Sequence, residues 1–165
     1  WRSEHPAYIT HHTRMEHPML RTLSIAAVTL GIIVSTSTWA QSKPADDSVY
    51  QAWGGKDGIH AVMEDFFVRL QADARTGPFF KNASRERLVF QLTEQLCQES
   101  GGPCTYQGRP MGPLHASMNI GKGDFNALVA VLQQSMDAKG IPFSAQNGML
   151  ARLAPMHRDI ITQGR

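Results

Sequence analysis

The sequence has few side chains suited to holding a metal ion: two cysteines and seven histidines, four of which lie before residue 19. This scarcity argues against a structural zinc site, which needs four ligands. Charge is scarce too, at 18% of residues, and from residue 41 onward 13 basic residues face 12 acidic ones, a net of +1. Binding to nucleic acid needs a concentrated basic face, so we expect no nucleic-acid partner.

The alternation of apolar and polar residues that is typical of strands is absent after residue 48, as are internal repeats and low-complexity segments. Four segments instead have apolar residues at helical spacing, and each begins near a residue that can cap a helix: Asp57, Ser84, Asp124 and Ser144. The first three end at glycine- and proline-containing breakers: Thr76-Gly-Pro78, Ser100-Gly-Gly-Pro103 and Gly140-Ile-Pro142. Pro155 should bend the fourth helix. We therefore predict an all-α domain.

The N-terminal part of the chain is typical of a processed leader. Residues 1–18 show no periodicity and are interpreted as a wrongly assigned upstream segment, with the true start at Met15 or Met19. Residues 19–40 combine a basic start, an uncharged apolar run and a small-residue exit at Ala40, which together predict a signal peptide. An uncleaved anchor is the alternative. Residues 41–47 form a polar spacer before a domain over 48–162, so we expect export, to a bacterial periplasm, and no membrane span after cleavage.

The two cysteines, Cys97 and Cys104, both lie in the part of the chain expected to be exported. Two cysteines in an oxidising compartment indicate one disulfide. Their spacing of seven residues crosses a helix end and a Gly-Gly-Pro turn, which can bring the two Cα atoms within bonding range. A pair of free thiols is the alternative.

The long connection between the second and third predicted helices, residues 101–123, carries His115. A long irregular connection inside a compact domain is usually functional. The apolar residues near His115 in the sequence suit an axial ligand of a haem iron, and they are Met111, Leu114, Met118, Ile120 and Phe125. A histidine beside apolar residues is also found as an ordinary core or loop residue, so this motif alone leaves both interpretations open.

Six segments taken together resemble group I truncated haemoglobins, in that family's order and spacing. They are Tyr50-Gln-Ala-Trp-Gly-Gly55, Glu64-Asp-Phe-Phe-Val-Arg69, Gly77-Pro-Phe-Phe80, Gly101-Gly-Pro-Cys-Thr-Tyr-Gln-Gly108, Met111 to His115, and Leu153-Ala-Pro155. The resemblance covers residues 48–162. It implies a two-on-two helical sandwich around one haem b, with His115 as the proximal ligand of the iron and with Phe80, beside Phe79, packed on the porphyrin.

On the distal side the sequence departs from the family's pattern. The family commonly has a tyrosine at the position of Phe67 and a glutamine at that of Leu92, and both donate hydrogen bonds to bound oxygen. Here both are apolar, as is Leu88 on the same helix face. Loss of a donor to a partly charged ligand is worth about 1.5–3 kcal/mol, or roughly a ten- to hundredfold faster release of O2. Gln91 is the nearest polar residue; its side chain can turn toward the ligand or lie at a haem edge, and we expect the edge.

The remaining candidate residues each have two interpretations. His157 matches a position that bonds covalently to haem in some relatives, but a one-residue shift of the comparison puts Met156 there instead. His60 is expected to be a partly exposed helix residue. Tyr106 and Arg109 suit the haem propionates, and solvated loop residues explain both equally well.

The resemblance implies a haem protein that binds O2, NO or CO reversibly, for oxygen transport or for gas sensing or scavenging, and that is served by an unidentified reductase. The alternative function is enzymatic, as a nitric oxide dioxygenase or a peroxidase at the same iron. An apolar set at Phe67, Leu88 and Leu92 favours binding over turnover, because both reactions need a polarised or protonated ligand. A haem-free helical adaptor is a third interpretation.

Overall fold

The computed structural model describes residues 46–163, and all secondary structure in that range is helical. The elements are α1 (Ser48–Ala52), α2 (Gly55–Ala72), α3 (Gly77–Phe80), α4 (Arg85–Glu99), α5 (Met111–His115), α6 (Lys122–Ala138), α7 (Phe143–Leu153), the 3-10 turn η1 (Ala154–Met156) and α8 (His157–Ile160). The predicted upstream segment, signal peptide and most of the spacer lie outside the described residues. Within residues 46–163, no helix is both long and apolar enough to cross a bilayer.

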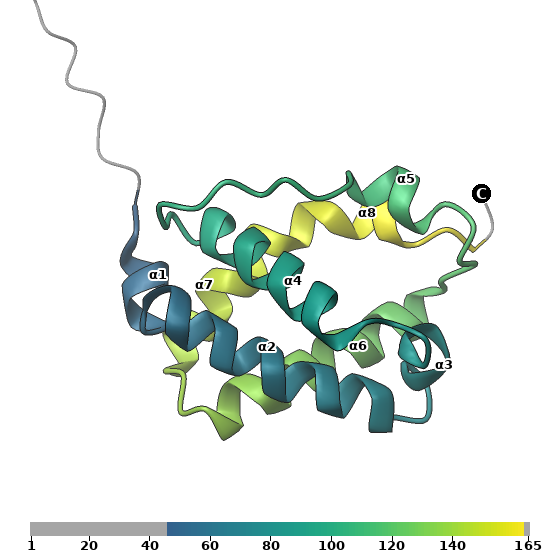
Figure 1. The fold of residues 1–165 in the computed structure, drawn as a ribbon, viewed down its shortest axis with the longest axis horizontal. Coiled ribbons are helices and arrows are strands. Elements are labelled where there is room, and N and C mark those ends of the chain that lie inside the picture. The colour runs from purple at the N-terminus through teal and green to yellow at the C-terminus, as the bar shows by residue number, and fades with distance from the viewer. Residues whose placement is uncertain (1–45, 164–165) are drawn as a thin grey trace, which may run out of the picture. The chain divides into compact units, whose positions relative to one another are not determined.

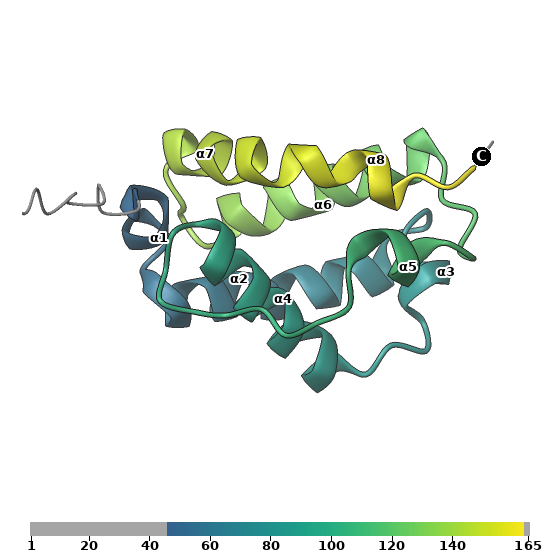
Figure 2. The same ribbon diagram turned by 90° about the horizontal axis from the view of Figure 1, so that it is seen from above.

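The long helices form two facing pairs. α2 packs against α4 and also against α6, while α7 contacts both α1 and α4. Figures 1 and 2 show the pair α2 and α4 on one side of the domain, and α6 with the nearly continuous rod of α7, η1 and α8 on the other. α5 lies beside α8 at the end of the domain that also holds α3. The predicted two-on-two helical sandwich is confirmed.

Three helix starts differ from the sequence prediction. α2 begins at Gly55 rather than after Asp57, because Gly54 takes a left-handed conformation at φ +78° that a glycine adopts without strain. α6 begins at Lys122, so Asp124 is its third residue, and its Oδ2 accepts a 2.9 Å hydrogen bond from the Gly121 N–H. α7 begins one residue before Ser144, at Phe143. Ser84 caps α4 as predicted, by accepting from the Arg87 N–H.

Pro155 was predicted to bend the last helix, but it interrupts the helix with little change of direction (Figure 2). The chain passes from α7 through the three-residue turn η1 into α8, and the three pieces follow one line in Figure 2. Proline has no N–H to donate, and a 3-10 turn accommodates it at its second position. The interruption keeps α8 beside α5.

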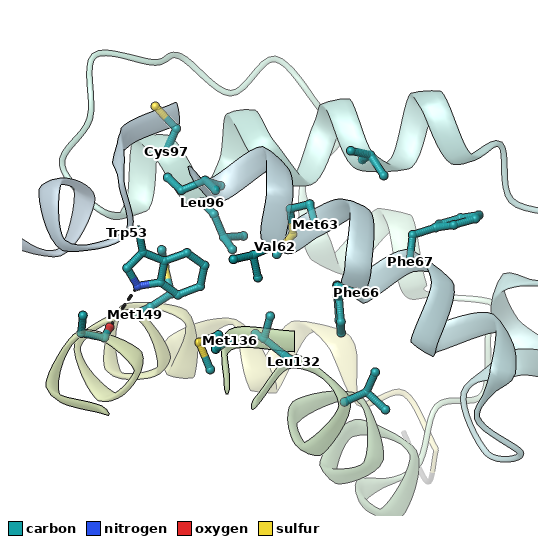
Figure 3. Close-up of a cluster of buried hydrophobic side chains, with 14 of the residues drawn as sticks. Trp53, Val62, Met63, Phe66, Phe67, Leu96, Cys97, Leu132, Met136 and Met149 are labelled. Carbon is teal, nitrogen blue, oxygen red and sulfur yellow. Dashed lines mark hydrogen bonds between the residues drawn. The ribbon is translucent and has the colours of Figure 1, made fainter. Parts of the chain in front are cut away.

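The hydrophobic core joins the two helix pairs along the length of α2, from Trp53 before its start to Leu70 near its end. Trp53 is 1% exposed, and its indole N–H donates to the Ala145 carbonyl of α7 over 3.2 Å. Met63 of α2, Met136 of α6 and Met149 of α7 are fully buried around it, as Figure 3 shows. Burial of a side chain of this size is worth about 1.5–3 kcal/mol, so this core fixes the helix pairs against each other.

Cys97 and Cys104 form a disulfide, the pairing expected from the sequence, with their Cα atoms 5.7 Å apart. The bond ties the last turn of α4 to the connection that leads to α5. Gly102 lies between them under the ring of Tyr50, where a Cβ atom would approach that ring to 2.5 Å. Only a glycine fits this turn.

Candidate functional site

A cavity of about 470 Å³ opens between the two helix pairs, and α5 closes one side of it. That volume lies within the 300–1,000 Å³ common for small-molecule and cofactor sites. The lining is mainly apolar and comes from α2, α3, α4, α5, α6, α7, η1 and α8 together with the loops beside α5. A cavity lined by this many elements depends on the whole fold rather than on one motif.

His115 lies in this lining, at the end of α5, and is half-buried. Its Nδ1 is 2.8 Å from the Met111 carbonyl oxygen, four residues earlier in the same short helix. A carbonyl accepts, so Nδ1 carries the proton in this contact and Nε2 is left with a free lone pair. An imidazole fixed in this tautomer by a backbone carbonyl is the usual form of a metal-binding histidine.

Eleven further residues expected at a cofactor from the sequence also line the cavity. They are Phe79, Phe80, Leu88, Gln91, Leu92, Tyr106, Met111, Leu114, Met118, Ile120 and Phe125. Phe80 and Leu88 also pack against the core cluster, as does Leu92. The structure therefore gathers residues separated by almost 50 positions around one space.

Phe67 is the exception among these residues, because the structure places it outside the cavity lining. Its ring is buried in the core cluster and is absent from the cavity lining, to which α2 instead contributes Met63, Phe66 and Leu70. These three follow a spacing of i, i+3 and i+7, and Phe67 lies about 100° further round the helix from Phe66. Figure 3 shows the two rings leaving α2 in different directions.

The cavity face of α4 carries two rows of side chains. One row is apolar, Leu88, Leu92 and Leu96, and the other consists of the amides Gln91 and Gln95. The Gln91 Oε1 atom is buried and has no hydrogen-bond partner. Gln95 was missed by sequence reasoning, although its spacing of four from Gln91 places both on one face of a helix.

Gln95 is 6% exposed and reaches across to the other side of the cavity. Its Nε2 lies 3.3 Å from the sulfur of Met156 in η1 and 3.8 Å from that of Met111 in α5. Thioether sulfur is a weak acceptor, so these contacts leave most of the amide's hydrogen-bonding capacity unused. α4 thus presents two incompletely satisfied amides to an otherwise apolar space.

Tyr106 and Arg109 have different positions. The Tyr106 ring lines the cavity, its hydroxyl donates to the Arg109 carbonyl over 3.1 Å, and its burial raises the pKa of the phenol. Arg109 is exposed and lies outside the lining, where it donates to the Pro113 carbonyl over 3.2 Å. Of the two, only Tyr106 faces the cavity.

The charged group of the lining is Asp124, at the start of α6. The Gly121 N–H and then the Arg75 guanidinium, 2.8 Å away, hold the pKa of the Asp124 carboxyl below its ordinary value. The carboxylate is therefore ionised and fully engaged with these donors. It is a poor candidate for proton transfer inside the cavity.

The two other histidines of the domain lie outside the cavity lining. The His157 ring packs edge-to-face on Phe125, with ring centroids 4.9 Å apart. It therefore contacts a residue of the cavity lining without being part of that lining. His60 is exposed on α2, with its Nε2 4.0 Å from a Glu64 oxygen, as expected for a surface helix residue. In the described part of the chain, no three His, Cys, Asp or Glu side chains are grouped to hold a metal ion.

Helices paired two on two, with a lone histidine facing the enclosed cavity, define the truncated class of globin. Residues 48–162 match the sequence profile of the bacterial-like globins, and the chain belongs to this family. It is 30% identical over 122 residues to the group 1 truncated hemoglobin GlbN of Mycolicibacterium paratuberculosis, covering 74% of this chain and 88% of that one. The Nostoc commune protein of the same name is 27% identical over 70% of this chain and 98% of its own.

The fold agrees with solved structures of the same class. The crystal structure of truncated hemoglobin from Tetrahymena pyriformis in its Fe(III) form superposes with a TM-score of 0.66 at 26% identity, covering 68% of this chain and 97% of that one. Membership of a globin family implies haem and a diatomic gas ligand. The residues present fit that group, because an apolar cavity faces an imidazole whose Nε2 is free to bind iron.

Proposed function

We propose that this protein holds one haem b through His115 and binds a diatomic gas, O2, NO or CO, reversibly. The observation that carries the proposal is the His115 imidazole, which faces an apolar cavity with its Nδ1 fixed on the Met111 carbonyl. When bound, haem supplies an iron atom that takes a gas molecule on its distal side. The chain's own residues orient the proximal ligand and exclude water from the site.

Attachment without a covalent bond is supported by the cysteines and by His157. Covalent haem attachment through vinyl groups commonly uses free cysteine thiols, and both cysteines here are joined to each other. His157 packs on Phe125 outside the cavity lining. In this proposal haem is retained by the bond to His115 and by apolar packing against Phe79, Phe80 and their neighbours.

The row Leu88, Leu92 and Leu96 supports weak retention of O2. Bound O2 carries partial negative charge and is held by donors, whereas CO and NO depend on them less. None of these three side chains can donate, and Gln91 lies one position round the helix from Leu92. We infer rapid O2 release, with CO and NO affected less.

Reversible binding is favoured over catalysis by the same lining. Peroxide cleavage needs a polar acid or base near the iron, and nitric oxide dioxygenation needs a firmly held O2. Mixing the O2-bound protein with NO distinguishes these functions. We expect slow conversion to nitrate, while stoichiometric conversion near the diffusion limit would establish the enzyme instead.

The proposed location is outside the cytoplasm, in a periplasm, with an unidentified reductase keeping the iron ferrous. Support comes from the leader-like residues 19–40 and from the pairing of both cysteines, since disulfides persist in oxidising compartments. Fractionation of cells that express the full chain tests this proposal. Recovery of the unprocessed protein in the cytosol would contradict it.

The decisive experiment is a set of absorption spectra of the purified protein in ferric, ferrous and CO-bound forms. We expect a Soret band in all three forms of the wild type and its loss in His115→Ala, because the variant has no proximal ligand. His60→Ala is the matched control, as its ring lies on the surface of α2, and it should keep the wild-type spectrum. A His115→Ala variant with an unchanged ferrous spectrum would overturn the assignment of the ligand.

A further inference from the structure

We propose that the Cys97–Cys104 disulfide positions the proximal histidine, and that its reduction accelerates the loss of haem. This inference rests on the proposed function of the same site. It concerns the connection of residues 100–110, which joins the end of α4 to the start of α5. The disulfide fastens the first part of that connection, and a series of contacts leads from there to His115.

The proximal helix has little anchorage of its own. α5 contains five residues, none of them buried, and the helix that it contacts most is α8, which has four residues. Helices of this length are unstable without tertiary support. The placement of α5 therefore depends strongly on the segments attached to its two ends.

The connection before α5 is anchored to the last turn of α4. Cys97 is 0% exposed within the core, so a bond to it holds Cys104 against a buried part of α4. The Gly102 N–H donates to the Cys97 carbonyl over 2.8 Å. Beyond the disulfide, the Tyr106 N–H donates to the Gln98 side chain over 2.8 Å. Residues 97–106 thus form one closed unit.

A second set of contacts links this unit to α5, the helix that carries His115. The Tyr106 ring covers Gly108 so closely that a Cβ atom there would lie 2.1 Å from it, and its hydroxyl donates to the Arg109 carbonyl. The Arg109 guanidinium in turn donates to the Pro113 carbonyl inside α5. These contacts join the disulfide to α5, and the rate of haem release measures the coupling between them.

Reduction would lengthen the free connection. A dithiol reductant gives up two electrons and two protons: its thiolate attacks the half-buried Cys104 sulfur and displaces Cys97 as a thiolate, which takes up a proton. The second thiol of the reductant then releases Cys104 as a thiol and closes the reductant's own disulfide. Loss of a loop constraint raises the entropy of the opened state. We therefore expect the opened state of α5 to be more populated, and haem to leave through it faster.

The experiment measures transfer of ferric haem from the protein to an excess of apomyoglobin. Cys97→Ala/Cys104→Ala should release haem about tenfold faster or more, the scale set by closure of a short loop. Wild-type protein that is reduced after folding with a phosphine, then alkylated, should match the variant, which guards against a folding defect. Trp53→Phe is the control for general destabilisation, because it removes the hydrogen bond to the Ala145 carbonyl at the end of the domain away from α5 (Figure 1).

Hydrogen exchange of the haem-free proteins gives an independent readout. Amide exchange in the double variant should be faster than in wild type over residues 105–118, and it should be unchanged over α2 and α6. Two results would overturn the proposal. One is an equal rate of haem release from protein with the disulfide intact and with it reduced. The other is faster exchange in every helix of the double variant together with a Trp53→Phe variant that releases haem as fast as the double variant. Absence of a Soret band from the oxidised protein would overturn the proposed function, and this inference with it.

Discussion

The two walls of the cavity are built in different ways. α4 is a helix of 15 residues, and its Val89, Leu96 and Cys97 side chains belong to the core. α5 has five residues and none buried, and it carries the histidine. The wall formed by α4 is therefore set by helix periodicity, while the wall that carries His115 is set by the connections around it. Substitutions in the first wall should change ligand chemistry, and those in the second should change stability and haem retention.

The largest effect is expected from restoring a donor to the apolar row of α4. Leu92→Gln should slow O2 release by roughly ten- to a hundredfold, because a hydrogen bond to a partly charged ligand is worth about 1.5–3 kcal/mol. Stopped-flow displacement of O2 by CO measures the rate. Leu153→Gln adds the same amide to the lining from the other helix pair and should leave O2 release within about threefold of wild type. Equal slowing in both variants would show that an amide need not come from α4 to retain O2.

The wall carrying the histidine is tested through two of its glycines. Gly102→Ala places a Cβ atom 2.5 Å from the Tyr50 ring and 2.8 Å from the Cys97 sulfur, and should cost about 1–3 kcal/mol by overpacking. At Gly112, within α5, a Cβ atom would have its nearest neighbour 4.0 Å away. Gly112→Ala should therefore be neutral or stabilise α5 by up to about 1 kcal/mol. Thermal unfolding of the haem-free proteins gives the melting temperature of each variant. An equal fall in melting temperature in Gly102→Ala and Gly112→Ala would refute the assigned difference in packing.

A smaller effect is expected from Gln91, whose buried Oε1 lacks a partner. Gln91→Leu removes that unsatisfied atom and should leave the protein as stable as wild type, or about 1 kcal/mol more stable. If the amide lies at a haem edge, O2 release should change by less than about threefold. A tenfold faster release would instead identify Gln91 as a donor to the gas. Denaturant titration and the O2 displacement assay measure the two quantities.

The smallest effect concerns acid stability. Asp124 has a lowered pKa in the folded protein because it accepts from the Gly121 N–H and pairs with Arg75. A group with a lowered folded pKa stabilises the fold above its unfolded pKa, near 3.8, and that stability is lost as the pH falls through the folded value. Asp124→Asn should therefore flatten the fall in melting temperature below about pH 4. If the melting temperature falls equally with decreasing pH in the variant and the wild type, the role assigned to Asp124 is contradicted.

The long helices were predictable from the sequence because their apolar residues repeat over three or more turns. The same periodicity left Phe66 and Phe67 indistinguishable, since both are buried and only the packing of α2 decides which one reaches the cavity. α1, α3 and α5 were not predicted, because four or five residues are too few to show a period. His115 was predicted as a ligand through the resemblance of six segments to a known family, since its own motif left two interpretations open. Gln95 was missed because its contacts with α5 and η1 arise only in the folded chain.

Hydrogen bonds from Arg152 hold the start of the domain at the end away from α5 and His115 (Figure 1). One guanidinium nitrogen of Arg152 donates to the Glu99 carbonyl and the other to the Asp46 carbonyl, 3.0 Å in each case, which ties the chain entry to the ends of α4 and α7. Figure 1 shows α1 and α5 at opposite ends of the domain. A purification tag or fluorescent protein fused directly ahead of residue 46 would therefore join the domain at the end away from α5 (Figure 1), whereas trimming the chain past Asp46 would remove the hydrogen bond from Arg152.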